Sequence, residues 1–140
     1  MIQILAGAKG EGKTKRLLQM ANDASKVSDG NVVFIDDDSR HMYDLNYRIR
    51  FVETSKFTML DQNVFFGFIC GILSQNSDIE KVFIDGLGNI VRDIDNDGMV
   101  QFIRELEKTC ADRDEKNLDF TLIISAPVDT LPEEIKKYII

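Results

Sequence analysis

The residues with the clearest chemical potential form a glycine- and lysine-rich loop near the start of the chain. Residues 7–14 read GAKGEGKT and match the pattern GxxxxGK[ST] at every fixed position. Glycines in such a loop allow positive φ angles and let backbone N–H groups converge on phosphate oxygens. Lys13 would reach the β- and γ-phosphates, and the Thr14 hydroxyl would complete the coordination of Mg²⁺. The spacing predicts a phosphate-binding site with the candidate residues Gly7, Lys9, Gly10, Glu11, Gly12, Lys13, Thr14 and Lys15.

The charge of this loop differs from that of the whole chain. The 140 residues include 17 Lys and Arg against 24 Asp and Glu, a net charge of −7. Residues 9–16, by contrast, carry four basic side chains against Glu11 alone, a local excess of +3. One basic loop suits a small polyphosphate, whereas nucleic acid or an anionic membrane needs an extended positive field. Nucleic acid is therefore not an expected partner. Membrane insertion is not expected either, because the longest apolar run, residues 64–73, is about half a bilayer span.

Carboxylates stand at the ends of two apolar segments further along the chain. Asp85 directly follows one apolar run, and Asp36, Asp37 and Asp38 directly follow another. Three successive carboxylates repel one another, and a nearby metal ion or lysine would relieve that repulsion. Two interpretations stay open for the triplet: a site that uses a metal, and a solvated acidic loop in which one aspartate caps a turn. For Asp85 the two interpretations are a carboxylate at a metal site and a strand-terminal aspartate that caps a turn.

Alternating strands and helices are predicted to position these residues. Apolar runs and one alternating segment predict strands at residues 2–6, 32–35, 47–51, 81–85 and 120–125. Periodicity predicts helices at about 13–26, 61–73 and 97–111, and a last short helix opened by a capping box of Thr130 and Glu133. The second helix, capped by Asp61, is apolar nearly all round, so deep packing is expected. Strands joined through helices pair in parallel, which predicts an α/β three-layer sandwich with a mainly parallel sheet, in one domain over residues 1–140.

Several other kinds of chemistry are excluded by what the chain contains. Cys70 and Cys110 are far apart and are interpreted as reduced, small apolar residues on buried positions. His41 is the only histidine, and neither zinc-ligand spacing nor a GxSxG nucleophile motif accompanies it. Residues 93–98, DIDNDG, match the first half of a calcium-binding EF-hand loop, but Arg104 occupies the position that needs a bidentate glutamate. An acidic turn that leads into the following helix is the better interpretation.

With a glycine-rich loop after one strand and carboxylates after two others, most of the chain resembles the P-loop NTPases of RecA-like, additional-strand type. The VFID segment ending at Asp85 resembles the Walker B strand, whose aspartate in that family holds the Mg²⁺ shell through water. The FIDDD segment ending at Asp38 is similar to the stretch that carries the water-activating glutamate of RecA-like ATPases. The resemblance implies Thr14, Asp85 and Asp36 at the metal and Asp38 as the base, with Asp36 and Asp37 as rivals. Aspartate is one methylene shorter than glutamate, so slow turnover is expected.

The resemblance also implies roles for residues outside the loop. Ser125 ends the last predicted strand, and in this group of ATPases a polar residue at that place, next to the P-loop strand, often senses the γ-phosphate. Satisfying backbone groups before the following Ala-Pro is the alternative role for its hydroxyl. Arg40, Arg48 and Arg50 are candidates for stabilising phosphate charge in a second molecule, although each is also typical of a solvated surface.

Together these residues imply a cytoplasmic protein that binds ATP and Mg²⁺ and hydrolyses ATP slowly or when a partner stimulates it. Two alternatives stay open. One is a small-molecule or nucleotide kinase, because kinases share the glycine-loop motif. The other is a non-catalytic module whose bound nucleotide controls assembly with a protein partner or a second copy. The chain is also similar to short P-loop ATP-binding proteins of Gram-positive bacteria, which supplies no physiological role. DNA strand exchange is not implied, because no basic loop region resembles the DNA-contacting parts.

Overall fold

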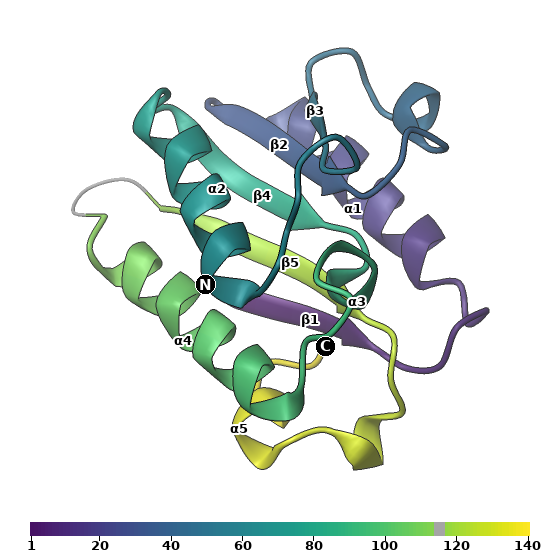
Figure 1. The fold of residues 1–140 in the computed structure, drawn as a ribbon. Helices are drawn as coiled ribbons and strands as arrows, with labels where there is room; N and C mark the ends of the chain where they lie inside the picture. The colour runs from purple at the N-terminus through teal and green to yellow at the C-terminus, as the bar shows by residue number, and fades with distance from the viewer. Residues whose placement is uncertain (114–116) are drawn as a thin grey trace.

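A parallel β-sheet covered by helices on both faces organises the computed structural model, which describes residues 1–113 and 117–140 (Figure 1). The described residues form five parallel strands in the order β1-β5-β4-β2-β3. The strands are β1 (Ile2–Ala6), β2 (Asn31–Asp36), β3 (Arg50–Glu53), β4 (Ile79–Ile84) and β5 (Asp119–Ile124). The helices are α1 (Lys13–Val27), α2 (Gln62–Ser74), α3 (Leu87–Ile90), α4 (Asn96–Ala111) and α5 (Glu133–Lys136), with 3-10 turns η1 (Met42–Asp44) and η2 (Val128–Thr130). The predicted α/β three-layer sandwich is confirmed.

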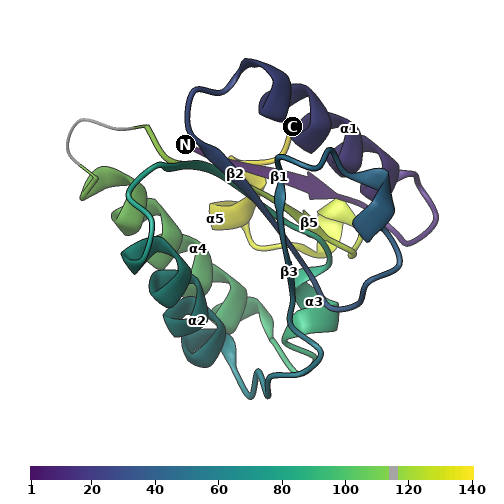
Figure 2. The ribbon, with the colours of Figure 1, turned by 90° about the horizontal axis from the view of Figure 1, so that it is seen from above.

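The two faces of the sheet are buried by different helices. Figure 2 shows α1 on one side of the sheet and α2 and α4 on the other. In β2, Val32 and Phe34 pack in the core on the α1 side, while Val33 and Ile35 pack in the larger core with α2 and α4. Successive strand side chains point to opposite faces, so a strand covered on both sides must be apolar at every position. The apolar runs of the sequence therefore predicted these strands correctly.

The strand order and the parallel pairing determine which loops lie next to one another at the carboxyl edge of the sheet. β5 lies between β1 and β4, and all the strands are parallel. The glycine-rich loop after β1, the aspartate triplet that begins with the last residue of β2, and Asp85 after β4 therefore lie at the same carboxyl edge of the sheet. In open α/β sheets the crevice outside this edge is where ligands bind.

The outer edge of β1 is covered by the last residues of the sequence. The Ile4 amide donates to the Tyr138 carbonyl (2.9 Å), and the Ile140 amide donates to the Ile4 carbonyl (3.0 Å). These bonds satisfy backbone groups that an edge strand otherwise leaves open to other chains. At the opposite edge of the sheet lies β3.

The strand predicted over residues 47–51 is wrong at its start, because β3 begins only at Arg50. Asn46 closes a turn immediately before it: its side-chain oxygen accepts the amide of Arg48 (3.0 Å), and its carbonyl accepts the amide of Ile49 (3.0 Å). An asparagine that bonds to the backbone two residues ahead stabilises a turn. This local bonding overrides the alternating pattern of apolar and arginine residues.

Helix α2 begins as predicted but is not deeply packed. The Asp61 carboxylate accepts the amides of Asn63 (2.9 Å) and Val64 (3.0 Å), which confirms the predicted N-cap. Phe65 and Ile69 are buried, whereas Val64 is 41% exposed. The expectation of deep burial was wrong because α2 covers the sheet and α4 on one side only (Figure 2). Its opposite side is apolar or small and faces solvent.

The predicted capping box at residues 130–133 does not form. The Thr130 hydroxyl donates to the Pro127 carbonyl (2.6 Å) inside η2, and α5 begins later, at Glu133. Pro132 precedes that helix and fixes its entry, so Thr130 is too far from the first turn to cap it.

The acidic segment before α4 caps that helix, as the sequence indicated. The Asp95 carboxylate accepts the Gly98 amide (2.7 Å), and Asp97 lies in the first turn, where a negative charge complements the helix dipole. Cys70 and Cys110 are free and only half-buried, so the expected burial of Cys110 is partial. Within residues 1–113 and 117–140, every helix is too short or too polar to cross a bilayer.

Candidate functional site

The glycine-rich loop joins β1 directly to α1. Gly10 (φ 87°) and Gly12 (φ 80°) adopt left-handed backbone conformations that strain any side chain-bearing residue, and Gly12 is the N-cap residue of α1. The amides at the start of a helix have no partner inside it, and the helix dipole places positive charge at the same end. The loop therefore has the conformation and the donors that an anion site needs.

Two side chains of the loop fold back over it. The Lys13 ammonium donates to the Ala8 carbonyl (2.6 Å). The Glu11 carboxylate lies so close to Gly7 that a Cβ on that glycine would overlap it. The Glu11 carboxylate is the end of a flexible side chain and could move aside, so it is the backbone angle of Gly7 (φ 146°) that favours glycine at this position. The other two lysines proposed from the sequence, Lys9 and Lys15, are exposed.

Thr14 and Asp85, far apart in the sequence, meet at the carboxyl edge. The Thr14 hydroxyl donates to Asp85 Oδ1 at 3.3 Å, so the first turn of α1 contacts the end of β4 across the position of β5. The Asp85 amide donates to the Ile35 carbonyl (2.9 Å), which fixes the backbone of this carboxylate against β2. Burial raises the pKa of Asp85, and the hydrogen bond from Thr14 opposes that rise.

Asp36 is the most deeply buried acidic residue of the site, with 3% of its surface exposed. Its Oδ1 accepts the Asp37 amide (2.7 Å), while its Oδ2 is buried and has no hydrogen-bond partner in the described part of the chain. Burial, the Asp37 side chain and the charge of Asp85 raise the pKa of Asp36 to about 8. A buried carboxylate oxygen without a partner is unfavourable unless a ligand completes its surroundings.

These donors fit a hard divalent cation. Carboxylate oxygens of Asp36, Asp37 and Asp38 lie within 4.8 Å of one another, and the Thr14–Asp85 pair supplies a hydroxyl and another carboxylate. Mg²⁺ prefers such oxygen ligands and usually keeps several waters and phosphate oxygens. A cation would also relieve the repulsion between Asp36 and Asp85 and satisfy the unpaired Asp36 Oδ2.

Asp38 is engaged by a neighbour in its own loop. Its Oδ1 accepts the Arg40 amide (3.0 Å), and its Oδ2 accepts Arg40 Nε (3.0 Å) and a terminal guanidinium nitrogen (2.8 Å). These bonds to Arg40 lower the pKa of Asp38. A carboxylate held in this way is a weaker base than a free one. The hydrogen bonds from Arg40 must therefore break before Asp38 can accept a proton.

The other two arginines proposed for charge stabilisation are not near the glycine-rich loop in its own chain. Arg48 lies in the turn before β3, with its guanidinium 6.0 Å from the centre of the Tyr47 ring. Arg50 is exposed at the start of β3, at the edge of the sheet far in the strand order from β1.

Ser125 lies directly after β5 and is exposed rather than part of the strand. It lines a cavity of about 260 Å³ that also contacts Lys9 of the glycine-rich loop and Asn89 of α3. Asn89 lines a second cavity, of about 410 Å³, together with Asp37. Asn89 therefore lies between the cavity that contacts the glycine-rich loop and the cavity that contacts Asp37. Sequence reasoning missed Asn89, because no local pattern marks a single asparagine in a four-residue helix.

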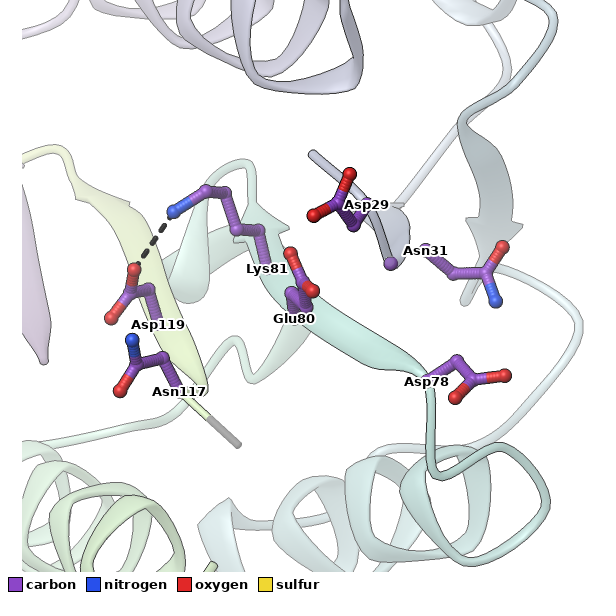
Figure 3. A pocket seen from close by; sticks show the side chains of 8 residues that line it. Asp29, Asn31, Asp78, Glu80, Lys81, Asn117 and Asp119 are labelled. Atoms are coloured by element: carbon purple, nitrogen blue, oxygen red, sulfur yellow. Dashed lines mark hydrogen bonds and ion pairs between the residues drawn. The ribbon is translucent and has the colours of Figure 1, made fainter. Parts of the chain in front are cut away.

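A different cavity, of about 580 Å³, opens at the amino ends of β2, β4 and β5 (Figure 3). Lys81 forms an ion pair with Asp119 there (2.8 Å). Burial by itself would raise the pKa of Asp119, but the hydrogen bond and the charge of Lys81 outweigh it, so the pKa is lowered. The remaining acidic lining comes from Asp29, Asp78 and Glu80 (Figure 3). This acidic cavity would repel phosphate groups, in contrast to the glycine- and lysine-rich loop at the carboxyl edge.

The carboxyl edge of this α/β sheet therefore brings together a glycine-rich loop between β1 and α1, the aspartates at the end of β2 and Asp85 after β4. A solved structure agrees with this fold: a KaiC-like protein from the hyperthermophilic archaeon Pyrococcus horikoshii OT3 superposes with a TM-score of 0.63 and 17% sequence identity. The match covers 98% of this chain and 66% of that one, so the chain spans about two thirds of its neighbour. No family model matches the sequence, and no curated protein matches it significantly. The chain therefore shares the α/β fold of this KaiC-like protein.

Proposed function

We propose that this protein binds ATP with Mg²⁺ at the carboxyl edge of its sheet and hydrolyses it slowly or on stimulation by a partner. The observation that carries the proposal is the contact between the Thr14 hydroxyl and Asp85, which joins the end of the glycine-rich loop to a buried carboxylate. In this proposal the loop amides and Lys13 bind the phosphates. Thr14, Asp85 and Asp36 hold Mg²⁺, which would neutralise charge on the β- and γ-phosphates.

Asp38 and Ser125 are proposed to act at the γ-phosphate. Asp38 would orient the attacking water and accept its proton, and Ser125 would donate a hydrogen bond to a phosphate oxygen. Ser125 shares a cavity with Lys9 of the loop, which supports its placement near the phosphates. Asp38 is bound by Arg40, which supports slow turnover in the isolated chain.

A second candidate function is a nucleotide-controlled binding module without turnover. The three hydrogen bonds from Arg40 to Asp38 favour it, because they occupy both oxygens of the proposed base. The two functions separate in one measurement: a protein that binds ATP and Mg²⁺ but releases no phosphate at saturating nucleotide is the binding module.

Thermal unfolding with different nucleotides tests the common part of both functions. ATP or ADP with Mg²⁺ at about a hundred times its Kd is expected to stabilise the protein by about 2.7 kcal/mol. For a chain of this size, that is an increase in Tm of roughly 5–10 °C. GTP tests base preference, and adenosine, which lacks phosphates, is the control that should produce no increase. Unchanged melting with every nucleotide would contradict nucleotide binding.

Asp38→Asn is expected to remove turnover while leaving binding nearly intact. Asparagine keeps the size and loses the proton acceptor, and a general base contributes about a hundredfold or more to rate. Phosphate release and the nucleotide-induced increase in Tm should be measured on the same samples. Asp44→Asn, an exposed carboxylate paired with His41, is the matched control. Turnover that survives in Asp38→Asn would assign the base to Asp36 or Asp37.

A further inference from the structure

Arg40 places a positive charge against the aspartates at the end of β2. Its Nε (3.0 Å) and a terminal nitrogen (2.8 Å) both donate to Asp38 Oδ2, and its backbone amide donates to Asp38 Oδ1 (3.0 Å). Carboxylate oxygens of Asp36, Asp37 and Asp38 lie within 4.8 Å of one another. The hydrogen bonds and the charge of Asp38, and also the charges of Asp37 and Asp36, raise the pKa of Arg40. Arg40 is therefore a counter-ion for the whole triplet and not for Asp38 alone.

A Mg²⁺ ion and the Arg40 guanidinium would neutralise the same cluster of carboxylates. In the proposed function Asp36 binds Mg²⁺ together with Thr14 and Asp85, whereas Arg40 binds the triplet through Asp38. Asp36 Oδ2 is buried and has no hydrogen-bond partner in the described part of the chain, so Arg40 leaves this proposed metal ligand free. Two cations held by one cluster repel one another. Each therefore weakens the binding of the other, and by linkage the two effects are equal in free energy.

The pair of Arg40 and Asp38 can separate without any rearrangement of the core. Their side chains are 76% and 36% exposed, so water surrounds the pair and screens its attraction. Exposed ion pairs of this kind are weak. Mg²⁺ carries twice the charge of a guanidinium and is held by several oxygens at once. A Mg²⁺ ion that arrives with a nucleotide is therefore expected to displace Arg40 from the triplet, whereas a free Mg²⁺ ion must compete with it.

We propose that Arg40 is a built-in counter-ion that Mg²⁺ and nucleotide displace, so that Asp38 is released only when the metal arrives. This inference rests on the proposed function, from which it takes Mg²⁺ binding at Asp36 and the role of Asp38 as base. Once Asp38 is free, the attacking water forms a bond to the γ-phosphorus and its proton passes to Asp38. ADP leaves with the electron pair of the broken P–O bond. Arg40 is thus a positioning residue that acts through Asp38.

Arg40→Gln tests the proposal through metal binding in the absence of nucleotide. Mn²⁺ takes the same oxygen ligands as Mg²⁺, and its free fraction is measured by EPR. Loss of the counter-ion is expected to lower the Kd for Mn²⁺ about threefold to tenfold. Arg92→Gln is the matched control, because Arg92 is also exposed and lines a cavity together with Asp37. Its Kd should stay within about twofold of the wild-type value, since water screens a charge that is not held against the triplet.

The double variant Asp38→Asn/Arg40→Gln shows whether Arg40 acts through Asp38. In Asp38→Asn the guanidinium has lost its charged partner, so removing Arg40 as well should change the Kd for Mn²⁺ by less than about twofold. Phosphate release gives a second readout. Arg40→Gln is expected to raise kcat about threefold to tenfold with KM unchanged, because the base is free in a larger fraction of the molecules.

Three results would overturn the role of Arg40. One is an unchanged affinity for Mn²⁺ in Arg40→Gln. Another is equal tightening in Arg92→Gln, since removing any positive charge at this edge would then suffice. The third is a lower kcat in Arg40→Gln, which would mean that the arginine assists the reaction directly. The Mn²⁺ titration contains no nucleotide, so its outcome is separate from that of the thermal unfolding with ATP, which tests the proposed function itself.

Discussion

Lys13→Ala is expected to abolish the increase in Tm that nucleotide and Mg²⁺ give to the wild-type protein. The Lys13 ammonium is bound to the Ala8 carbonyl of the glycine-rich loop at 2.6 Å, so its charge is already positioned within the loop. Alanine removes this charge from the β- and γ-phosphates. The lost stabilisation is about 2.7 kcal/mol at a hundredfold excess of nucleotide over Kd. Thermal unfolding with and without Mg²⁺–ATP measures it.

Arg16→Ala is the matched control for this prediction. Arg16 is exposed on the first turn of α1 and loses the same unit of charge when replaced. It should keep most of the increase in Tm, because its position is outside the loop motif. Equal losses in both variants would mean that general attraction, and not the geometry of the loop, binds the phosphates. A full increase in Lys13→Ala would contradict the phosphate-binding assignment.

Asp36→Asn is expected to stabilise the metal-free protein and to abolish the Mg²⁺-dependent part of nucleotide binding. Asp36 has 3% of its surface exposed and one oxygen without a partner, and burial is the main cause that raises its pKa to about 8. Asparagine is neutral at every pH, so it removes the cost of taking up a proton when the carboxyl is buried on folding, and it is a poor ligand for Mg²⁺. We therefore expect the substitution to raise the stability of the protein and to weaken Mg²⁺ binding, a combination that is common at functional sites.

The pH dependence of this effect has a defined sign. Between the ordinary pKa of 3.8 and about 8, Asp36 is protonated in the folded protein and ionised in the unfolded chain. The folded state then binds more protons, so its stability falls as pH rises, by up to about 1.4 kcal/mol per pH unit from this group, and levels off above pH 8. Asp36→Asn removes this contribution. The free energy of unfolding of the variant should therefore exceed that of the wild type by an amount that grows with pH up to about 8.

Urea unfolding in EDTA from about pH 5 to 9 measures that difference. Asp129→Asn, at an exposed position, is the control and should follow the wild type at every pH. An advantage of Asp36→Asn that is constant with pH would contradict the raised pKa. Mg²⁺-dependent nucleotide binding that survives in Asp36→Asn would remove Asp36 from the metal site.

The parts of the site that were predictable from the sequence depend on local patterns. The glycine-rich loop, α1, the strand ending in Asp36 and the strand just before Asp85 follow from short motifs and from apolar runs that are buried on both faces. Parallel pairing then brings the strand ends together, which is why Thr14 and Asp85 meet although 71 positions separate them. Motif and topology together therefore predict this part of the site.

The contacts that the sequence did not predict depend on competition between partners. Arg40 was one of three arginines considered for charge stabilisation in a second molecule or for a solvated surface, and a carboxylate two residues away binds its guanidinium. The composition of α2 could not show that one of its sides faces solvent either. An apolar helix has the same composition whether its second side is buried in the core or exposed. Asn46 illustrates a third case. Its side chain stabilises a turn, so residues 47–49 do not form the strand that their alternating pattern predicted.

The position of β1 has a consequence for how the chain folds during synthesis. In the described residues, β1 pairs only with β5, from Ile2 with Phe120 to Ala6 with Ile124, and with the segment around Ile139. A ribosome that makes the chain from its amino end therefore releases β1 long before either neighbour exists, and contacts so distant in sequence form slowly. The glycine-rich loop directly follows β1, so the strand that fixes the start of this loop has no paired neighbour until β5 has been synthesised.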